Sequence, residues 1–105
     1  MARRVAEELV QAGRCGPTVR LRVDLHGVSS FGPGNHHTLI RWEWIQRIVP
    51  DTHGVIVGGK DNEVVFPAGV FGLAPSELAE QLVRADSIFE RADVIAELGG
   101  ITDEE

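Results

Sequence analysis

The stretch from Thr18 to Leu25 constrains the fold more than any other part of this chain. Apolar side chains occupy every second position of this stretch, namely Val19, Leu21, Val23 and Leu25. Strict alternation with period two predicts a strand that has one buried face and one solvated face. Such strands are typical of antiparallel sheets, because strands of a helix-covered parallel sheet are apolar on both faces. The chain is therefore predicted to contain an antiparallel sheet.

A second informative stretch, residues 39–49, holds both tryptophans. Read with period two, Ile40, Trp42 and Trp44 share one strand face, which predicts that both indoles are buried. From Trp44 onward a helical turn fits the apolar pattern better, so this stretch is predicted to enter as a strand and leave through a turn. Further short strands are predicted at 28–31, 55–57 and 63–66, so that antiparallel strands occupy residues 18–67 between turns rich in glycine and proline.

Helices are predicted at both ends of the chain. Residues 3–12 place Val5, Leu9 and Ala12 at helical spacing, which predicts a short N-terminal helix. Residues 75–98 are predicted to form a C-terminal amphipathic helix, with an apolar stripe at Leu78, Leu82, Ala85, Phe89, Ala92 and Ala96. In an alternative reading this helix breaks near 86–87, because Ser87 and Glu90 have the spacing of a capping box. Residues 101–105 are predicted to be a disordered tail.

Length and composition favour one cytoplasmic domain. A chain of 105 residues is large enough for one modest core, so residues 1–105 are predicted to be a single domain. Every apolar run is too short for the roughly 20 residues of a membrane span. The basic N-terminus is followed at once by Glu7 and Glu8, where a signal peptide would be apolar. The single cysteine, Cys15, cannot form an internal disulfide, which agrees with a reducing compartment.

Charge is distributed unevenly, with a net +3 on residues 1–50 and −9 on residues 51–105. An anion-binding first half or head-to-tail association would explain this asymmetry, and so would an acidic solvated helix beside a mixed sheet. The candidate anion or partner surface consists of Arg20, Arg22, Arg41 and Lys60. Against an anion site, these arginines can pair with acids such as Asp24 and Glu43 across the sheet.

Residues 54–60 fit the letters G-x-x-x-x-G-K of a phosphate-binding loop. That loop needs flexible residues between its glycines and a Ser or Thr after the lysine. Here the intervening Val-Ile-Val is predicted to be a strand, and Asp61 follows Lys60 and would repel phosphate. Nucleotide binding is therefore not predicted, and no cofactor site is assigned.

Metal and catalytic sites were sought among the histidines, cysteine and serines. The candidate metal ligands, His26, His36, His37, His53 and Cys15, lack the spacing of common zinc sites. Cys15 beside Arg14, and Ser29 and Ser30 near His26, have no recognisable oxyanion or base context. No metal ligand and no catalytic residue is assigned from the sequence.

Two short motifs carry a family resemblance. A W-x-x-I element spans Trp42 to Ile45, and the phrase Val64-Val65-Phe66-Pro67 ends a later strand before the closing helix. With the antiparallel strands, these motifs resemble the bacterial pleckstrin-homology-like (PH-like) domains over roughly residues 18 to 86. The resemblance implies a partly open sheet or barrel with a C-terminal helix. The family fold has seven strands, whereas about five are evident here, and the predicted N-terminal helix is extra.

The predicted function follows from this resemblance. It implies a non-catalytic binding or assembly module that contacts a protein partner or an anionic lipid headgroup. An incomplete sheet would leave an edge, which favours self-association as a homo-oligomer. The alternative is a small enzyme or ligand-binding domain with a pocket between sheet and helix, near His26, His36 and Cys15. Binding of single-stranded nucleic acid through Trp42 or Trp44 ranks last, because the chain is acidic overall with a pI near 5.1.

Overall fold

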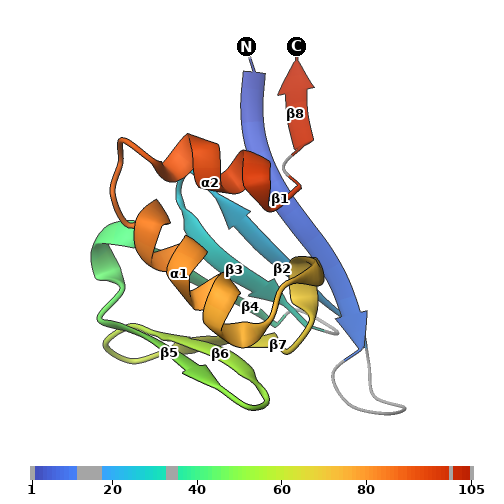
Figure 1. Cartoon of the computed structure of the whole chain (residues 1–105), viewed down its shortest axis with the longest axis vertical. Coiled ribbons are helices and arrows are strands. Elements are labelled where there is room, and N and C mark those ends of the chain that lie inside the picture. The colour runs from blue at the N-terminus through green and yellow to red at the C-terminus, as the bar shows by residue number, and fades with distance from the viewer. Residues whose placement is uncertain (1, 12–17, 33–35, 100, 105) are drawn as a thin grey trace.

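The computed structural model describes residues 2–11, 18–32, 36–99 and 101–104. They form an α+β fold with two antiparallel sheets and two α-helices (Figure 1). The five-stranded sheet has the order β4-β3-β2-β1-β8, with β1 Ala2–Gln11, β2 Thr18–Asp24, β3 Gly27–Phe31, β4 His37–Arg41 and β8 Ile101–Glu104. The three-stranded sheet has the order β5-β6-β7, with β5 Arg47–Asp51, β6 Gly54–Gly58 and β7 Glu63–Pro67. The α-helices are α1 Pro75–Ala85 and α2 Arg91–Glu97, and single 3-10 turns are η1 Trp42–Trp44 and η2 Val70–Gly72.

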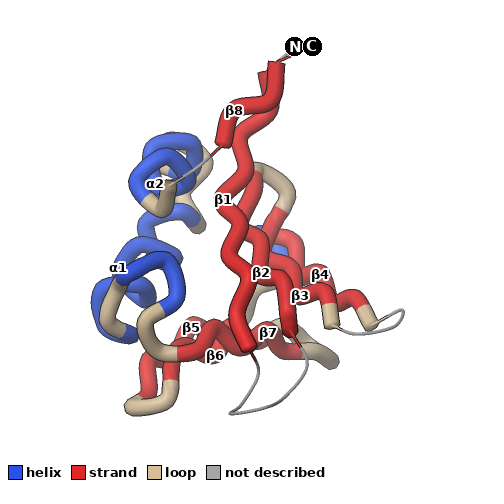
Figure 2. Tube along the Cα trace, turned by 90° about the vertical axis from the view of Figure 1, so that its right-hand side faces the viewer, coloured by secondary structure: helices blue, strands red, loops and turns tan. Residues whose placement is uncertain are grey.

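The two sheets meet at a corner and the helices close the space between them. Strand β7 contacts β3 and β4, helix α1 lies over β5 and β6, and helix α2 lies over β1. Figure 2 shows both helices on one side of the five-stranded sheet, with the three-stranded sheet across its lower end. The core between these layers has its largest fully buried side chains at Trp42, Phe66, Leu21, Ile40, Leu78, Leu82 and Ile95. The sheets do not close into a barrel in the described part of the chain.

The alternation predicted for residues 18–25 is present in β2, except that Leu25 lies beyond the end of the strand and is 44% exposed. Leu21 and Val23 are buried in the core, whereas Arg20 and Arg22 lie on the opposite face, which no described element covers (Figure 2). We call this the outer face of the five-stranded sheet. Gly27, the first residue of β3, lies very close to the backbone of β4. A Cβ on Gly27 would lie 2.1 Å from the Ile40 carbonyl oxygen. Glycine at this position therefore allows β3 and β4 to pair.

The prediction that residues 39–49 enter as a strand and leave through a turn is correct in that order, but the turn begins at Trp42 and not at Trp44. Strand β4 leads directly into η1, and the backbone N–H of Ile45 closes this turn on the Trp42 carbonyl. Trp42 is only 2% exposed, but Trp44 is 55% exposed. The prediction that both indoles are buried is therefore wrong for Trp44, because the period-two strand ends at Arg41 and the tighter turn redirects the next side chains.

The N-terminal segment is a strand, not the helix predicted over residues 3–12. In β1, Ala6 and Val10 face the core while Leu9 is exposed, which is the alternation of a strand. Long antiparallel pairing with β2, from Val5 opposite Asp24 to Gln11 opposite Thr18, satisfies its backbone and overrides the helical spacing. Residue 12 lies outside the described residues.

The sequence also missed two other strands. Residues 47–51, predicted as a helical turn and loop, form the edge strand β5 paired with β6. Residues 101–104, predicted as a disordered tail, form β8, which pairs with the first residues of β1. Both ends of the chain therefore lie side by side, and this pair of strands extends past the helices (Figure 1). Residue 105 lies outside the described residues.

The C-terminal helical segment breaks between Ala85 and Arg91, where the alternative reading placed a break. Pro75 occupies the first turn of α1, and the Glu77 carboxylate accepts a hydrogen bond from the Ala74 N–H at 3.0 Å. The predicted apolar stripe holds only for α1, which buries Leu78, Leu82 and Ala85. Helix α2 buries Val94 and Ile95 instead, Leu98 directly after the helix is also buried, and Phe89 is 91% exposed.

Candidate functional site: a groove between β5 and α1

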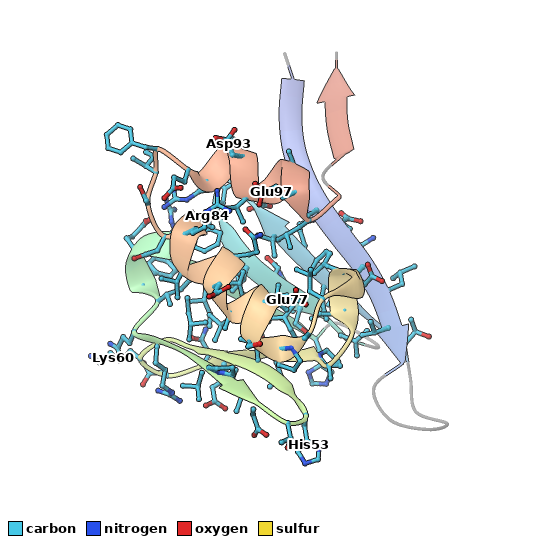
Figure 3. The ribbon with its side chains drawn as sticks, in the orientation of Figure 1. His53, Lys60, Glu77, Arg84, Asp93 and Glu97 are labelled. Carbon is cyan, nitrogen blue, oxygen red and sulfur yellow. The ribbon has the colours of Figure 1, made fainter. Side chains whose placement is uncertain are left out.

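The four candidate cations do not come together into one site. Arg20 and Arg22 lie on β2, and Arg41 lies two strands away at the end of β4, on the same outer face. Lys60 belongs to the β6–β7 turn of the other sheet. Figure 3 shows Lys60 at the end of this sheet that is opposite His53. The sequence therefore identified cations that the fold distributes over separate surfaces.

Most of these cations already have an anionic or aromatic partner. Arg22 forms an ion pair with Glu7, with nitrogen and oxygen 2.5 Å apart, and Arg41 pairs with Glu43 at 2.8 Å. Arg20 has no ion pair to another described residue, but its guanidinium lies 4.8 Å from the centre of the Phe31 ring. The expected pairing of acids with arginines is thus correct for Glu43. It is wrong for Asp24, whose carboxylate accepts backbone N–H groups.

Phe31 on the outer face is covered by its neighbours on both sides. The His37 ring stacks on it with centroids 4.2 Å apart and an interplanar angle of 8°. Since β2 and β4 flank β3 on opposite sides, Arg20 and His37 contact the phenyl ring from opposite sides. This face therefore offers no open aromatic ring on which a nucleobase could stack.

Trp42 joins three elements that are distant in sequence. Its indole N–H donates to the Asp24 carbonyl at 2.8 Å, and its backbone N–H donates to the His26 carbonyl at 3.2 Å. The Arg91 guanidinium lies 5.0 Å from the centre of the indole ring and also donates to the Ala85 carbonyl at 2.8 Å. We call this set of contacts the Trp42 hub. It connects the β2–β3 turn, η1 and the α1–α2 corner.

Trp44 stands at the open side of the same turn. Its ring lies 5.5 Å from the Arg41 guanidinium and borders a hollow of about 450 Å³, whose lining residues are Glu43, Trp44, Gln46, Lys60, Asp61 and Asn62. The Glu43 carboxylate accepts its own backbone N–H and faces Arg41, and both effects hold its pKa below the ordinary value. The lining has two acids, Glu43 and Asp61, and one cation, Lys60, so this hollow does not select for an anion.

This hollow continues into a groove that follows β5. A second hollow is lined by Ile45, Gln46, Arg47, Ile48, Val83 and Asp86. A third, of about 740 Å³, is lined by Ile48, Pro50, Ser76, Ala79, Glu80, Val83 and Arg84. The first and second hollows share Gln46, and the second and third share Ile48 and Val83. The three hollows adjoin one another along β5 from Trp44 to Pro50, and we call this row of hollows the β5–α1 groove.

The groove has an apolar floor and a charged rim. Ile48, Pro50, Ala79 and Val83 supply most of the floor. On the rim, Arg47 pairs with Glu63 at 2.5 Å. Arg84 pairs with Glu97 at 3.0 Å and with Glu90 at 3.3 Å, and these two acids raise its pKa (Figure 3). Glu80 and Asp86 also line the groove and form no ion pair with another described residue, so the rim keeps some negative charge.

The histidines expected to be candidate metal ligands are dispersed. His26 lies in the β2–β3 turn, His36 and His37 lie at the start of β4, and His53 lies in the β5–β6 turn. Within the ranges that the structure describes, no three His, Cys, Asp or Glu side chains gather as a metal site. Cys15, which the alternative enzyme hypothesis placed beside His26 and His36, lies outside the described residues.

The segment that resembles a phosphate-binding loop is the central strand of its sheet. Strand β6 pairs with β5 on one side and with β7 on the other. Its backbone N–H groups are thus used in the sheet and are not arranged around a phosphate.

The sequence did not identify the β5–α1 groove, although two signals for it exist. Pro50 lies in a strand, and proline within strands is found mainly at sheet edges. Val83 lies off the apolar stripe of α1 and is 58% exposed, so it is an apolar residue on the outward side of an amphipathic helix. That these residues face each other across a groove depends on how the helix packs on the sheet.

Comparisons with known proteins add no assignment. No protein-family model, curated protein or solved structure matches this chain. None of the helices in the described ranges combines the length and hydropathy that a membrane crossing requires.

Proposed function

We propose that this chain is a non-catalytic PH-like binding module, in a bacterial cytoplasm, that holds an extended segment of a protein partner in the β5–α1 groove. The observation that carries this proposal is the groove itself, because an apolar floor lies directly beside the edge of a sheet. Sheet edges and apolar grooves beside helices are two common ways in which domains bind peptides.

The edge of β5 supplies the backbone part of the interaction. In the described part of the chain β5 pairs only with β6, so its other side has unpaired backbone groups. Pro50 has no N–H, which removes one donor and limits uncontrolled pairing with other strands. At about 3.3 Å per residue, a partner segment of roughly five residues would span β5.

The apolar floor of the groove and Trp44 at its end would contact the side chains of the partner segment. Every second side chain of an extended segment points the same way, so an apolar side chain would enter the section lined by Ile48, Ala79 and Val83. At the other end, the exposed Trp44 ring would contact a neutral polar or aromatic side chain. Contact with an anionic headgroup has less support, since Arg22 and Arg41 are already paired and Lys60 lies on the other sheet.

Selection from a displayed library of linear peptides tests this proposal. Selected peptides are expected to shift the NMR amide signals of β5 and α1. Val83→Asp would place a charge on the groove floor and is expected to weaken binding by about tenfold or more, the equivalent of losing one buried apolar contact. Val65→Asp on β7 is the matched control, because Val65 is also exposed and lies outside the groove.

Three outcomes would contradict the proposal. Peptides that bind with equal affinity to Val83→Asp and to the unmodified chain would place binding elsewhere. Binding to phosphatidylserine vesicles that is lost in the Arg20→Ala and Lys60→Ala double variant would favour a headgroup partner. A metabolite or metal that raises the melting temperature of the chain would favour the enzyme or ligand-binding alternative.

A further inference from the structure

Helices α1 and α2 bury opposite sides of what the sequence presents as one helix. Successive residues of an α-helix are separated by about 100° around its axis. On a single straight helix, the buried residues of α1, mainly Leu78, Leu82 and Ala85, therefore share one side. The buried residues of α2, Val94 and Ile95, together with Leu98, lie on the opposite side. In the closed chain the helix breaks between Ala85 and Arg91, and this break lets one body cover both sides.

The break itself has no residue that requires it. Residues 86–90, which form the corner, contain neither glycine nor proline. The backbone of Asp86 and of Glu90 is already in the right-handed helical region. The corner also exposes two large apolar side chains, with Ile88 72% and Phe89 91% exposed. Nothing in its local chemistry prevents the corner from becoming helical.

The residues around the corner repeat with the spacing of two helical turns. Residues 84–90 read R-A-D-S-I-F-E, and residues 91–97 read R-A-D-V-I-A-E. Repeats at seven residues return to nearly the same side of a helix. The pattern of α1 therefore continues through the corner, and Phe89 falls on the same side as Leu78, Leu82 and Ala85.

We propose that two copies of this chain exchange the C-terminal arm formed by α2 and β8. In the exchanged dimer α1, the corner and α2 are one straight helix, whose two opposite buried sides are covered by the bodies of two different copies. The partner is a second copy of this chain, because the α2 surface already has a complementary site in the fold, beside β1 and α1.

The exchange preserves the contacts that α2 and β8 make with β1 and gives up those within the corner, such as the Arg84–Glu90 ion pair. Helix α2 would pack on β1 of the second copy, β8 would pair with that β1, and Arg84 would meet Glu97 of the second copy. The hydrogen bond from Arg91 to the Ala85 carbonyl would be replaced by a helical backbone bond. The gain is burial of Ile88 and Phe89, which lie at the midpoint of the straight helix, where the two copies meet. Since α1 and β5 stay in one body, the apolar floor of the β5–α1 groove, formed by Ile48, Pro50, Ala79 and Val83, is kept.

A cross-linking experiment distinguishes exchange from other dimers. In a Cys15→Ser background, Arg84→Cys and Glu97→Cys place thiols at the contact between α1 and α2. A short bismaleimide joins these thiols within one chain in a closed monomer or an unexchanged dimer, and between two chains in the exchanged dimer. After refolding at high micromolar concentration, the expected products are covalent dimers with twice the 11.4 kDa mass of one chain.

Two corner variants sharpen the test. Phe89→Ser removes the larger apolar side chain whose burial favours the dimer, so light scattering should find less dimer than for the unmodified chain. Inserting Gly-Ser-Gly-Ser after Ser87 favours the corner and should give only monomer. Monomer at every concentration for the unmodified chain, or dimers cross-linked only within chains, would overturn the proposal. If a corner variant fails to fold, the cross-linking of the full-length chain still decides.

Discussion

Trp42 and Trp44 belong to the same three-residue turn, yet they occupy opposite environments. Trp42 is buried, hydrogen-bonded to Asp24 and covered by Arg91. Trp44 is half exposed and borders the β5–α1 groove. The comparison shows how one short turn can serve both stability and recognition: its first residue holds distant elements together, and its last residue remains available to a ligand.

The largest expected difference is between the two indoles themselves. Trp42→Ala should lower the free energy of unfolding by about 3–5 kcal/mol, because it leaves a large cavity in the core. Trp44→Ala should change it by less than about 0.5 kcal/mol, as is usual for exposed side chains. Urea unfolding followed by circular dichroism measures both. Similar losses in the two variants would show that Trp44 is also part of the core.

A smaller difference is expected between two aspartates that close turns. The Asp24 carboxylate accepts the His26 N–H at 2.8 Å and the Gly27 N–H at 3.1 Å inside the Trp42 hub. Asp24→Ala should therefore cost about 1–3 kcal/mol, because a buried N–H loses its acceptor. Asp51, which accepts the His53 N–H at 3.2 Å in the exposed β5–β6 turn, is the control.

Asp51→Ala should cost less than about 0.5 kcal/mol, because water can replace the carboxylate. Thermal unfolding of both variants under the same conditions gives the comparison. A larger loss for Asp51→Ala would mean that the β5–β6 turn contributes more to stability than the Trp42 hub.

The two arginines over the indoles provide the next comparison. Arg91→Ala should lower the free energy of unfolding by about 1 kcal/mol, since it removes a cation–π contact and a bond to the Ala85 carbonyl. Arg41→Ala removes an exposed pair with Glu43 and should cost less than about 0.5 kcal/mol. Chemical denaturation of both variants measures their free energies of unfolding. Equal losses of stability would show that the two arginines contribute alike.

The smallest expected effect is the pH dependence at Glu43. Its carboxylate accepts its own backbone N–H and lies near Arg41, so its pKa in the folded chain is below the ordinary 4.5. A carboxylate whose pKa is lowered by folding stabilises the fold at pH values above its ordinary pKa. This contribution is lost as the pH falls through the lowered pKa. Glu43→Gln should be slightly less stable than the unmodified chain at neutral pH, and the difference should vanish in acid. A difference that grows on acidification would reverse the assigned direction.

The N-terminal strand shows where local pattern was misleading. Val5, Leu9 and Ala12 are spaced as on one side of a helix, and the prediction over residues 3–12 followed that spacing. In the fold, the alternating residues Ala6 and Val10 face the core, and β2 and β8 pair with the two edges of β1. Pairing with strands that are remote in sequence decided the outcome, because it satisfies backbone groups that local pattern does not address.

In the candidate site, too, the sequence shows which residue types are present, whereas contacts between distant residues decide what they do. The sequence identified Arg20, Arg22, Arg41 and Lys60 as cations. It also predicted Glu43 as an acid that pairs with them, but it could not show that Glu7 pairs with Arg22, because Glu7 reaches Arg22 only through the register of β1 and β2. Likewise, Val83 and Pro50 become neighbours in a groove only when α1 packs over β5.

The sequence by itself determined the features that depend on neighbouring residues. These are the strand alternation at residues 18–24, the turn at Trp42 after a strand, and the start of α1 at Pro75. Tertiary structure alone decided the features that depend on distant partners: strands β1, β5 and β8, the exposure of Trp44, and the side of α2 that is buried. The physical reason is that local periodicity shows which side chains share a face, whereas only packing determines what that face meets.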